Sequence, residues 1–199
     1  MQKNPDLSPS VGGEGATVGI GVIVQDANGN GVAGTPVTFT VTEGGGAITT
    51  TNPQQSDNAG KSGASWRLGK TVGRNVVRAS SGSLPPVDFE ITTTHGPLAV
   101  LVPEPGNPAS DTVARTVTVG VSARDANGNP VPGALVQFSV TGGGSIPAGP
   151  FQTNASGVAR VSWTLGTVAG QNTLTATSSG VPNLVIRVDG VPGPATKLV

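Results

Sequence analysis

The chain repeats its own sequence at a nearly constant interval, and this repeat constrains the fold more than any other feature. The run Asp-Ala-Asn-Gly-Asn at Asp26–Asn30 recurs 99 positions later at Asp125–Asn129. The run Trp66–Gly69 matches Trp163–Gly166, 97 positions later, so two residues have been lost from the loops between these motifs. Loops tolerate such losses, whereas strands with one buried face do not, so the repeat marks one structural unit used twice.

Apolar side chains alternate with polar or small ones through short segments of both copies. This period of two is typical of a strand with one buried face. Asn-Gly and Gly-rich turn signals separate the segments, which predicts about six or seven short strands in each copy. The sequence therefore predicts an all-β protein of two tandem immunoglobulin-like (Ig-like) antiparallel β-sandwiches. The inward positions expected in the first copy are Val18, Ile20, Val22, Val24, Val37, Phe39, Val41, Ala64, Trp66, Leu68, Val77, Ala79, Val87, Phe89 and Ile91.

The alignment divides the chain into two repeats and a short remainder. Repeat one is expected at residues 1–95 and lacks most of its first strand, because Met1–Lys3 stand opposite Val100–Val102 of repeat two. Repeat two is expected at residues 96–192 and opens with a Gly-Pro pair. Residues 193–199 begin with the same pair, so we expect them to form the first strand of a further repeat.

The motifs follow one another in a characteristic order. They read Val-x-Val-x-Asp-x-Asn-Gly-Asn, then Gly-x-x-Val-x-Phe-x-Val-Thr, a Gly-Gly-Gly turn, Gly-x-Ala-x-x-x-Trp-x-Leu-Gly and Gly-x-Asn. This order resembles the bacterial Ig-like domains of group one, the repeats of invasin- and intimin-type surface adhesins. The resemblance extends over essentially the whole chain and is stronger in repeat two, since Lys61 and Ser62 replace Val158 and Ala159 in repeat one. It implies an extracellular or cell-surface location and an array of repeats.

The charge balance and the lack of cysteine exclude several classes of partner and of chemical site. Lys and Arg number 11 and Asp and Glu number 11, so no broad electrostatic surface for nucleic acid is expected. The chain has no Cys, which excludes disulfides, thiolate metal sites and Cys nucleophiles. No run approaches the roughly 18 apolar residues that span a bilayer, so we expect no membrane insertion in this segment.

The Asp26–Asn30 run and its copy have oxygen ligands at alternate positions, as in part of a calcium loop. No bidentate Glu follows at the spacing that an EF-hand needs. A tight turn is the favoured interpretation, because Asn-Gly adopts positive φ and an Asp side chain accepts backbone N–H groups. We therefore predict no metal-ligating or cofactor-binding residues and keep calcium as an open alternative.

Trp66 and Trp163 fall in phase with inward-facing positions, so core packing is favoured over an exposed aromatic binding surface. His95 is the only histidine and lies at the joint between the repeats, without a nucleophile on a sharp turn. A Ser-His-Asp triad needs a histidine held by a buried carboxylate next to a serine nucleophile on a sharp turn. We therefore assign no catalytic residues and predict that the chain is not an enzyme.

Basic residues of repeat one, among them Lys61, Arg67 and Arg78, are expected to face solvent. A small patch for an anionic glycan is one interpretation. Repeat two keeps only Arg160 at the matched strand positions, so an ordinary solvated face is favoured.

Three functions stay open on the sequence. The first is a non-catalytic, rod-like stalk or adhesive segment of an extracellular protein, whose partners are neighbouring repeats. The second is a subunit of an extracellular filament, in which the C-terminal strand of one chain completes repeat one of the next. The third is a module that binds a glycan or host receptor. The segment expected to donate the strand is Pro194, Ala195, Thr196, Lys197, Leu198 and Val199.

Overall fold

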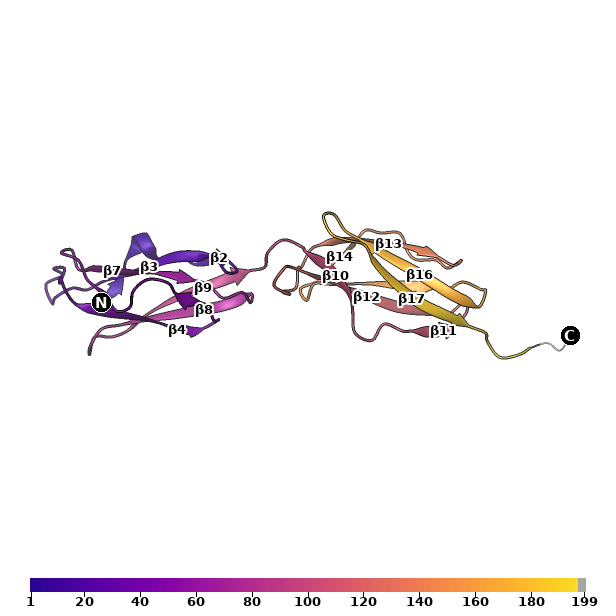
Figure 1. Ribbon diagram of the computed structural model, residues 1–199, viewed down its shortest axis with the longest axis horizontal. Coiled ribbons are helices and arrows are strands. Elements are labelled where there is room, and N and C mark those ends of the chain that lie inside the picture. Colours follow the sequence, from indigo (N-terminus) through magenta and orange to yellow (C-terminus); the bar gives the residue numbers. More distant parts are fainter. Residues whose placement is uncertain (197–199) are drawn as a thin grey trace. The chain divides into compact units, whose positions relative to one another are not determined.

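The computed structural model describes residues 1–196 and forms two compact units, Met1–His95 and Gly96–Val199 (Figure 1). Each unit is built from strands arranged in two sheets, and the described residues contain no α-helix. A single 3-10 turn, η1 (Pro5–Leu7), follows the first strand of unit one. The all-β prediction is therefore confirmed.

Unit one has a four-stranded sheet in the order β1-β3-β7-β5 and a five-stranded sheet in the order β2-β9-β8-β4-β6. Neighbouring strands are antiparallel except β2 and β9, which are parallel. The sequence pattern did not indicate this parallel pair. The strands are β1 (Gln2–Lys3), β2 (Val11–Gly13), β3 (Thr17–Ile23), β4 (Pro36–Glu43), β5 (Ala47–Ile48), β6 (Gln54–Gln55), β7 (Lys61–Arg67), β8 (Gly73–Ser80) and β9 (Val87–Thr94).

Unit two repeats this plan with sheets in the orders β10-β12-β15 and β11-β17-β16-β13-β14. The parallel pair recurs between β11 and β17. Where unit one has β5, unit two has a single bridge between Ser145 and Thr164. The strands are β10 (Val100–Pro103), β11 (Ser110–Thr112), β12 (Thr116–Arg124), β13 (Leu135–Thr141), β14 (Phe151–Gln152), β15 (Val158–Thr164), β16 (Gly170–Thr177) and β17 (Leu184–Val191).

Each unit has its own hydrophobic core, made by the alternating apolar residues of its strands. Trp66 and Trp163 lie at the centres of these cores with no exposed surface, which confirms their predicted burial. Neither indole N–H has a hydrogen-bond partner among the described residues. A Cβ added at Gly144 would lie 2.9 Å from Trp163 Nε1, so the Gly-rich turn leaves room for the indole edge.

The Gly-x-Asn motif joins two loops at one end of each sandwich. In unit one, the buried Asn75 accepts the N–H of Gly69 at 3.2 Å and donates to Gly73 O at 3.1 Å. In unit two, Asn172 accepts the N–H of Gly166 at 2.8 Å in the same way. These bonds satisfy backbone groups that water cannot reach, which explains why the motif occurs in both repeats.

The first strand of repeat one is shifted by one residue relative to repeat two when the structure is compared with the sequence alignment. Gln2 pairs with Ile23 of β3, whereas Val102 pairs with the matched residue of β12, Ser122. Structure thus matches Gln2 with Val102, a displacement of 100 rather than 99. The difference arises because the segment between β1 and β3 has one more residue than its counterpart in unit two. Strand β1 has two residues and β10 has four.

Candidate functional site

The Asp-Ala-Asn-Gly-Asn turn is the most elaborate polar arrangement of unit two. Asp125 Oδ1 accepts the backbone N–H groups of Asn127 at 2.9 Å and Asn129 at 2.8 Å. Asp125 Oδ2 accepts the side-chain amide of Asn129 and the backbone N–H of Gly96, both at 3.0 Å. The turn therefore connects the start of unit two, at Gly96, to the end of β12.

Asp125 is held as a carboxylate by these contacts. Burial alone would raise its pKa, since only 2% of the residue is exposed. Hydrogen bonds from Asn129, Gly96 and Asn127 outweigh burial and lower the pKa to about 2. The charge is thus retained at any pH above this value.

The matched turn of unit one has the same local geometry but a different environment. Asp26 Oδ1 accepts the N–H groups of Asn28 at 2.9 Å and Asn30 at 2.8 Å, and Oδ2 accepts the Asn30 side chain at 3.0 Å. Its pKa is lowered chiefly by the side-chain and backbone bonds from Asn30. Asp26 is exposed, whereas Asp125 is buried.

These contacts support the turn interpretation of both Asp-Ala-Asn-Gly-Asn runs. Every carboxylate oxygen of Asp26 and Asp125 already accepts N–H groups of its own turn, so no cation is needed to explain the residues present. Residues 1–196 also contain no group of three or more His, Cys, Asp or Glu side chains suited to holding a metal ion.

Some of the basic side chains of unit one pair with acids. Arg78 makes two bonds of 2.8 Å to Asp88, and this contact raises the pKa of Arg78. Arg74 pairs with both Glu43 and Glu90. These groups are about half exposed, so each pair contributes little to stability. Arg74 and Arg78 lie on β8, whereas Lys61 and Arg67 lie on β7 of the other sheet, so the structure does not bring the basic residues of the considered glycan patch together on one face.

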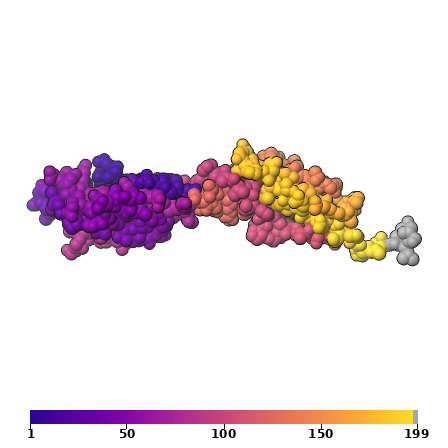
Figure 2. All heavy atoms as spheres, in the orientation of Figure 1, coloured from indigo at the N-terminus to yellow at the C-terminus, as the bar shows by residue number. Residues whose placement is uncertain are grey.

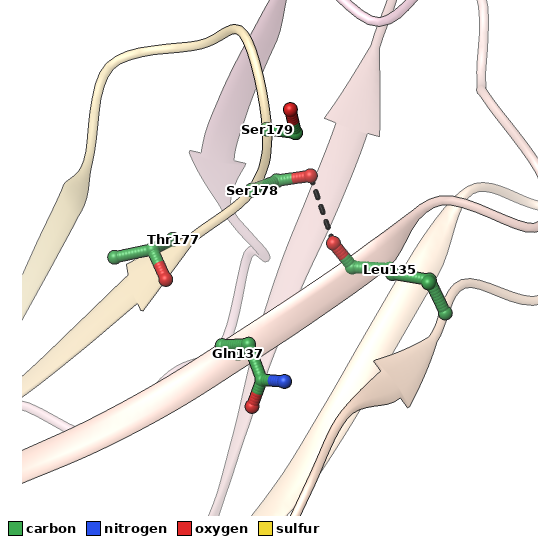
Figure 3. Close-up of a pocket in the computed structure, with 5 residues that line it drawn as sticks. All are labelled: Leu135, Gln137, Thr177, Ser178 and Ser179. Carbon is green, nitrogen blue, oxygen red and sulfur yellow. Dashed lines mark hydrogen bonds between the residues drawn. The ribbon is translucent and has the colours of Figure 1, made fainter.

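Two hollows in the described surface carry no catalytic constellation. One, of about 500 Å³, lies at one end of β13 and β16 (Figure 3) and is lined by Leu135, Gln137, Thr177, Ser178 and Ser179. Ser178 Oγ donates to Leu135 O at 2.8 Å across it. The lining offers hydroxyl, amide and apolar groups but no titratable side chain, so it provides no general acid or base.

A second hollow, of about 460 Å³, lies in unit one where β7 ends. Its lining includes Lys70 and Arg67, the second of which was considered from the sequence, beside three glycines. It contains no carboxylate or hydroxyl that could act as a nucleophile or base.

The segment expected to donate a strand lies beyond β17. Pro194, Ala195 and Thr196 are exposed and belong to no strand, whereas Lys197, Leu198 and Val199 lie outside the described residues. Figure 2 shows the last described part of the chain, residues 192–196 at the yellow end of the colour scale, extending away from the sandwich of unit two. Strand donation by this segment thus stays a prediction.

Comparison with known proteins identifies the domain type. Residues 101–185 match the family model of the bacterial Ig-like domain, group 1. Unit two is a bacterial Ig-like domain. Unit one, which the family model does not match, has the same strand order and repeats the motifs of unit two, as expected for a tandem copy. The prediction that the chain is not an enzyme agrees with this family, whose domains are structural or adhesive. A search of curated proteins found no match to the chain.

Solved structures share the fold at low sequence identity. The Yersinia pseudotuberculosis protein InvD is 22% identical over 94% of this chain and 57% of its own, with a TM-score of 0.56. FdeC, an adhesin of Escherichia coli, is 21% identical over 92% of this chain and 63% of its own, with a TM-score of 0.51. The D00-D0 domain of intimin is 18% identical over 96% of this chain and 98% of its own, with a TM-score of 0.50. The chain thus spans about three fifths of the length of the InvD and FdeC structures.

No helix among residues 1–196 is long and apolar enough to cross a membrane.

Proposed function

We propose that the chain is a non-catalytic, rod-like spacer segment of a bacterial cell-surface adhesin, in which Ig-like repeats form a stalk. The family of unit two supports this proposal, as does the fold shared with FdeC, itself an adhesin. A stalk requires repeats that transmit tension from one end to the other. The topology of each Ig-like repeat meets this requirement.

The chain enters and leaves each repeat at opposite ends, and this observation carries the proposal. In repeat one, β1 begins beside Ile23, the last residue of β3. Strand β9 ends at Thr94 beside Gly13, on the side where β3 begins. Tension applied to the two ends of the repeat therefore pulls along the strands rather than peeling them apart.

The parallel pair connects the two ends directly. Because β2 is pulled toward its N-terminus and β9 toward its C-terminus, all hydrogen bonds between them are loaded at once. In repeat two, β11 and β17 have the same relation, and Val113 N–H donates to Val191 O at 3.0 Å beside this pair. Such bonds resist force together, whereas bonds at an opening hairpin break one after another.

A glycan- or receptor-binding role has weaker support. Both Trp side chains, the usual anchors of a sugar or protein site, are fully buried. The hollow beside Leu135 is lined by neutral groups and is open to solvent. We therefore assign receptor binding to other parts of an adhesin.

Surface display tests the proposal. One, two or four copies of the chain are placed between an outer-membrane anchor and a peptide epitope, and the height of the epitope above the cell surface is measured. We expect an equal gain in height for each added copy, and no adhesion to host cells or glycan arrays. Equal height for all copy numbers would overturn the spacer role, and adhesion conferred by the chain alone would establish binding instead.

A further inference from the structure

Asparagine side chains differ in whether they can react with the backbone nitrogen of the residue that follows. In this reaction the nitrogen attacks the side-chain carbonyl carbon and displaces ammonia, which leaves a five-membered succinimide ring. The reaction requires a following residue with an N–H and no bulky side chain, and a side-chain amide that is unbonded and open to water. Glycine is the best following residue, because it has no Cβ and the freest backbone.

Most asparagines of the chain fail one of these requirements. Those followed by proline lack the attacking N–H, and they are Asn4, Asn52, Asn107 and Asn129. Asn75 and Asn172 are buried, and their amides are bonded inside the sandwich. Those followed by alanine or leucine have a Cβ beside the attacking nitrogen, and they are Asn58, Asn154 and Asn183.

Asn30 precedes a glycine but is held in place. Its side-chain amide donates to Asp26 Oδ2 at 3.0 Å. A Cβ built on Gly31 would lie 2.4 Å from the backbone of Ala59, so the peptide after Asn30 packs against a neighbouring turn and has little room to rotate. Asn30 is therefore excluded as well.

Asn127 of repeat two meets every requirement. It is exposed although Asp125 and Asn129 of the same turn are buried, and its side-chain amide has no hydrogen-bond partner in the part of the chain that the structure describes. A Cβ built on Gly128 would meet no heavy atom within 4 Å, so the space around the attacking residue is open. One hydrogen bond, from Gly128 N–H to Asp125 O at 3.1 Å, must break before the nitrogen can turn toward the side chain.

We propose that Asn127, together with its copy Asn28 in repeat one, is a site of spontaneous deamidation in the folded protein. Asn28 is followed by Gly29, whose N–H makes the same single bond, to Asp26 O at 3.1 Å. A Cβ built on Gly29 would likewise meet no heavy atom within 4 Å. The assignment goes beyond the spacer role and does not depend on it.

The reaction needs only water and hydroxide. The bond from Gly128 N to Asn127 Cγ forms as the bond from Cγ to Nδ2 breaks. The proton of the Gly128 nitrogen passes to hydroxide, and the displaced nitrogen takes a proton from water and leaves as ammonia. Water then opens the succinimide at either carbonyl, which gives aspartate or isoaspartate. The net change consumes one water and releases one ammonia.

Isoaspartate lengthens the backbone of the turn by one methylene group after position 127. The N–H groups of Gly128 and Asn129 follow the inserted group, and both bond to Asp125. The longer turn cannot keep both bonds at their present lengths, and the new carboxylate repels that of Asp125. The modification therefore loosens the turn that connects Gly96 to the end of β12.

Peptide mapping by mass spectrometry tests the assignment on the full, folded chain. The protein is incubated at mildly alkaline pH, and the conversion of amide to acid is followed at each asparagine. We expect modification at Asn127 and Asn28, at a rate that rises with pH. This rate should exceed that at asparagines followed by alanine or leucine by about 10-fold or more. Equal rates at all these positions, or an Asn127 that reacts in urea but not in the folded chain, would overturn the proposal.

The variant Asn127→Gln provides a matched test, because a glutamine amide must close a six-membered ring, which forms more slowly. It should abolish the modification in repeat two and leave the rate at Asn28 unchanged. Asn183→Gln, at another exposed asparagine, is the control and should alter neither rate. Equal release of ammonia from the two variants would contradict the assignment.

The consequence for repeat two is measured on the modified protein. The isoaspartate form is separated by chromatography, and its urea unfolding is followed through Trp163 in a Trp66→Phe background. We expect a lower midpoint than for Asn127→Asp, which adds the charge without lengthening the backbone. Equal midpoints for the isoaspartate form and the unmodified chain would refute the loosening of the turn.

Discussion

Replacing Asp125 with alanine should destabilise repeat two strongly, and the structure sets the magnitude. The substitution removes the acceptor of four hydrogen bonds. The Asn127 N–H can turn to water, but the Asn129 groups lie in a residue that is only 6% exposed, and Gly96 is partly covered. Each buried donor left without a partner costs about 1–3 kcal/mol, so we expect a loss of about 3 kcal/mol.

Fluorescence can report this loss for one repeat at a time, because each repeat has a single tryptophan at its core. In a Trp66→Phe background, Trp163 alone follows the urea unfolding of repeat two. With an m-value of about 1.5 kcal/mol/M, the midpoint should fall by about 2 M urea.

The matched substitution Asp26→Ala, followed through Trp66 in a Trp163→Phe background, is the control. Its donors lie on an exposed turn and can bind water, so a much smaller shift is expected. A fall of less than about 0.5 M for Asp125→Ala, or equal shifts in the two repeats, would refute the structural role of the covered turn.

Three further predictions concern single residues. Because the pKa of Asp125 is lowered to about 2, from about 3.9 unfolded, its contribution to stability is complete above pH 4 and lost as pH falls toward 2. Urea titrations at several pH values should show this slope, and Asp125→Asn should flatten it. Asn172→Ala strands the buried Gly166 N–H, so calorimetry should show a Tm about 10 °C lower for repeat two. Val113→Pro removes the bond to Val191 and should lower the unfolding force of repeat two more than Val113→Ala does.

The strands and their buried faces could be predicted because alternation reports directly on which side of a strand meets the core. Val18 to Val24 and their copies show this, as does the phase of Trp66. Turn chemistry was equally local, since the Asp26 carboxylate bonds only to residues within its own turn. The position of the core and the position of the turns therefore followed from short stretches of sequence.

Strand partners could not be predicted in the same way. The parallel strand β2 has the sequence Val-Gly-Gly, which shows no alternation, and it pairs with β9 only because the sandwich brings them together. The presence of glycine at two positions of β3 is likewise explained by a contact with a residue outside the strand. Leu7 of η1 covers them, and a Cβ at Gly19 or Gly21 would lie 3.0 Å from its methyl groups.

The candidate site was only half visible in the sequence. The repeated Asp-Ala-Asn-Gly-Asn run predicted a turn in each copy, but it did not show that Asp125 is buried and bonded to Gly96 whereas Asp26 is exposed. This difference depends on the tertiary environment of each turn, which the alignment of the two copies does not contain.

Stretching single chains tests most directly whether the two repeats are independent, tension-bearing units. The chain is held by handles at its two ends and extended at constant speed. We expect two separate unfolding events, each lengthening the chain by about 30 nm, as unravelling of roughly 95 residues requires. Val113→Pro should lower the force of one event and leave the other unchanged. A single event of about twice that length, or unfolding of both repeats at forces too low to detect, would contradict the account.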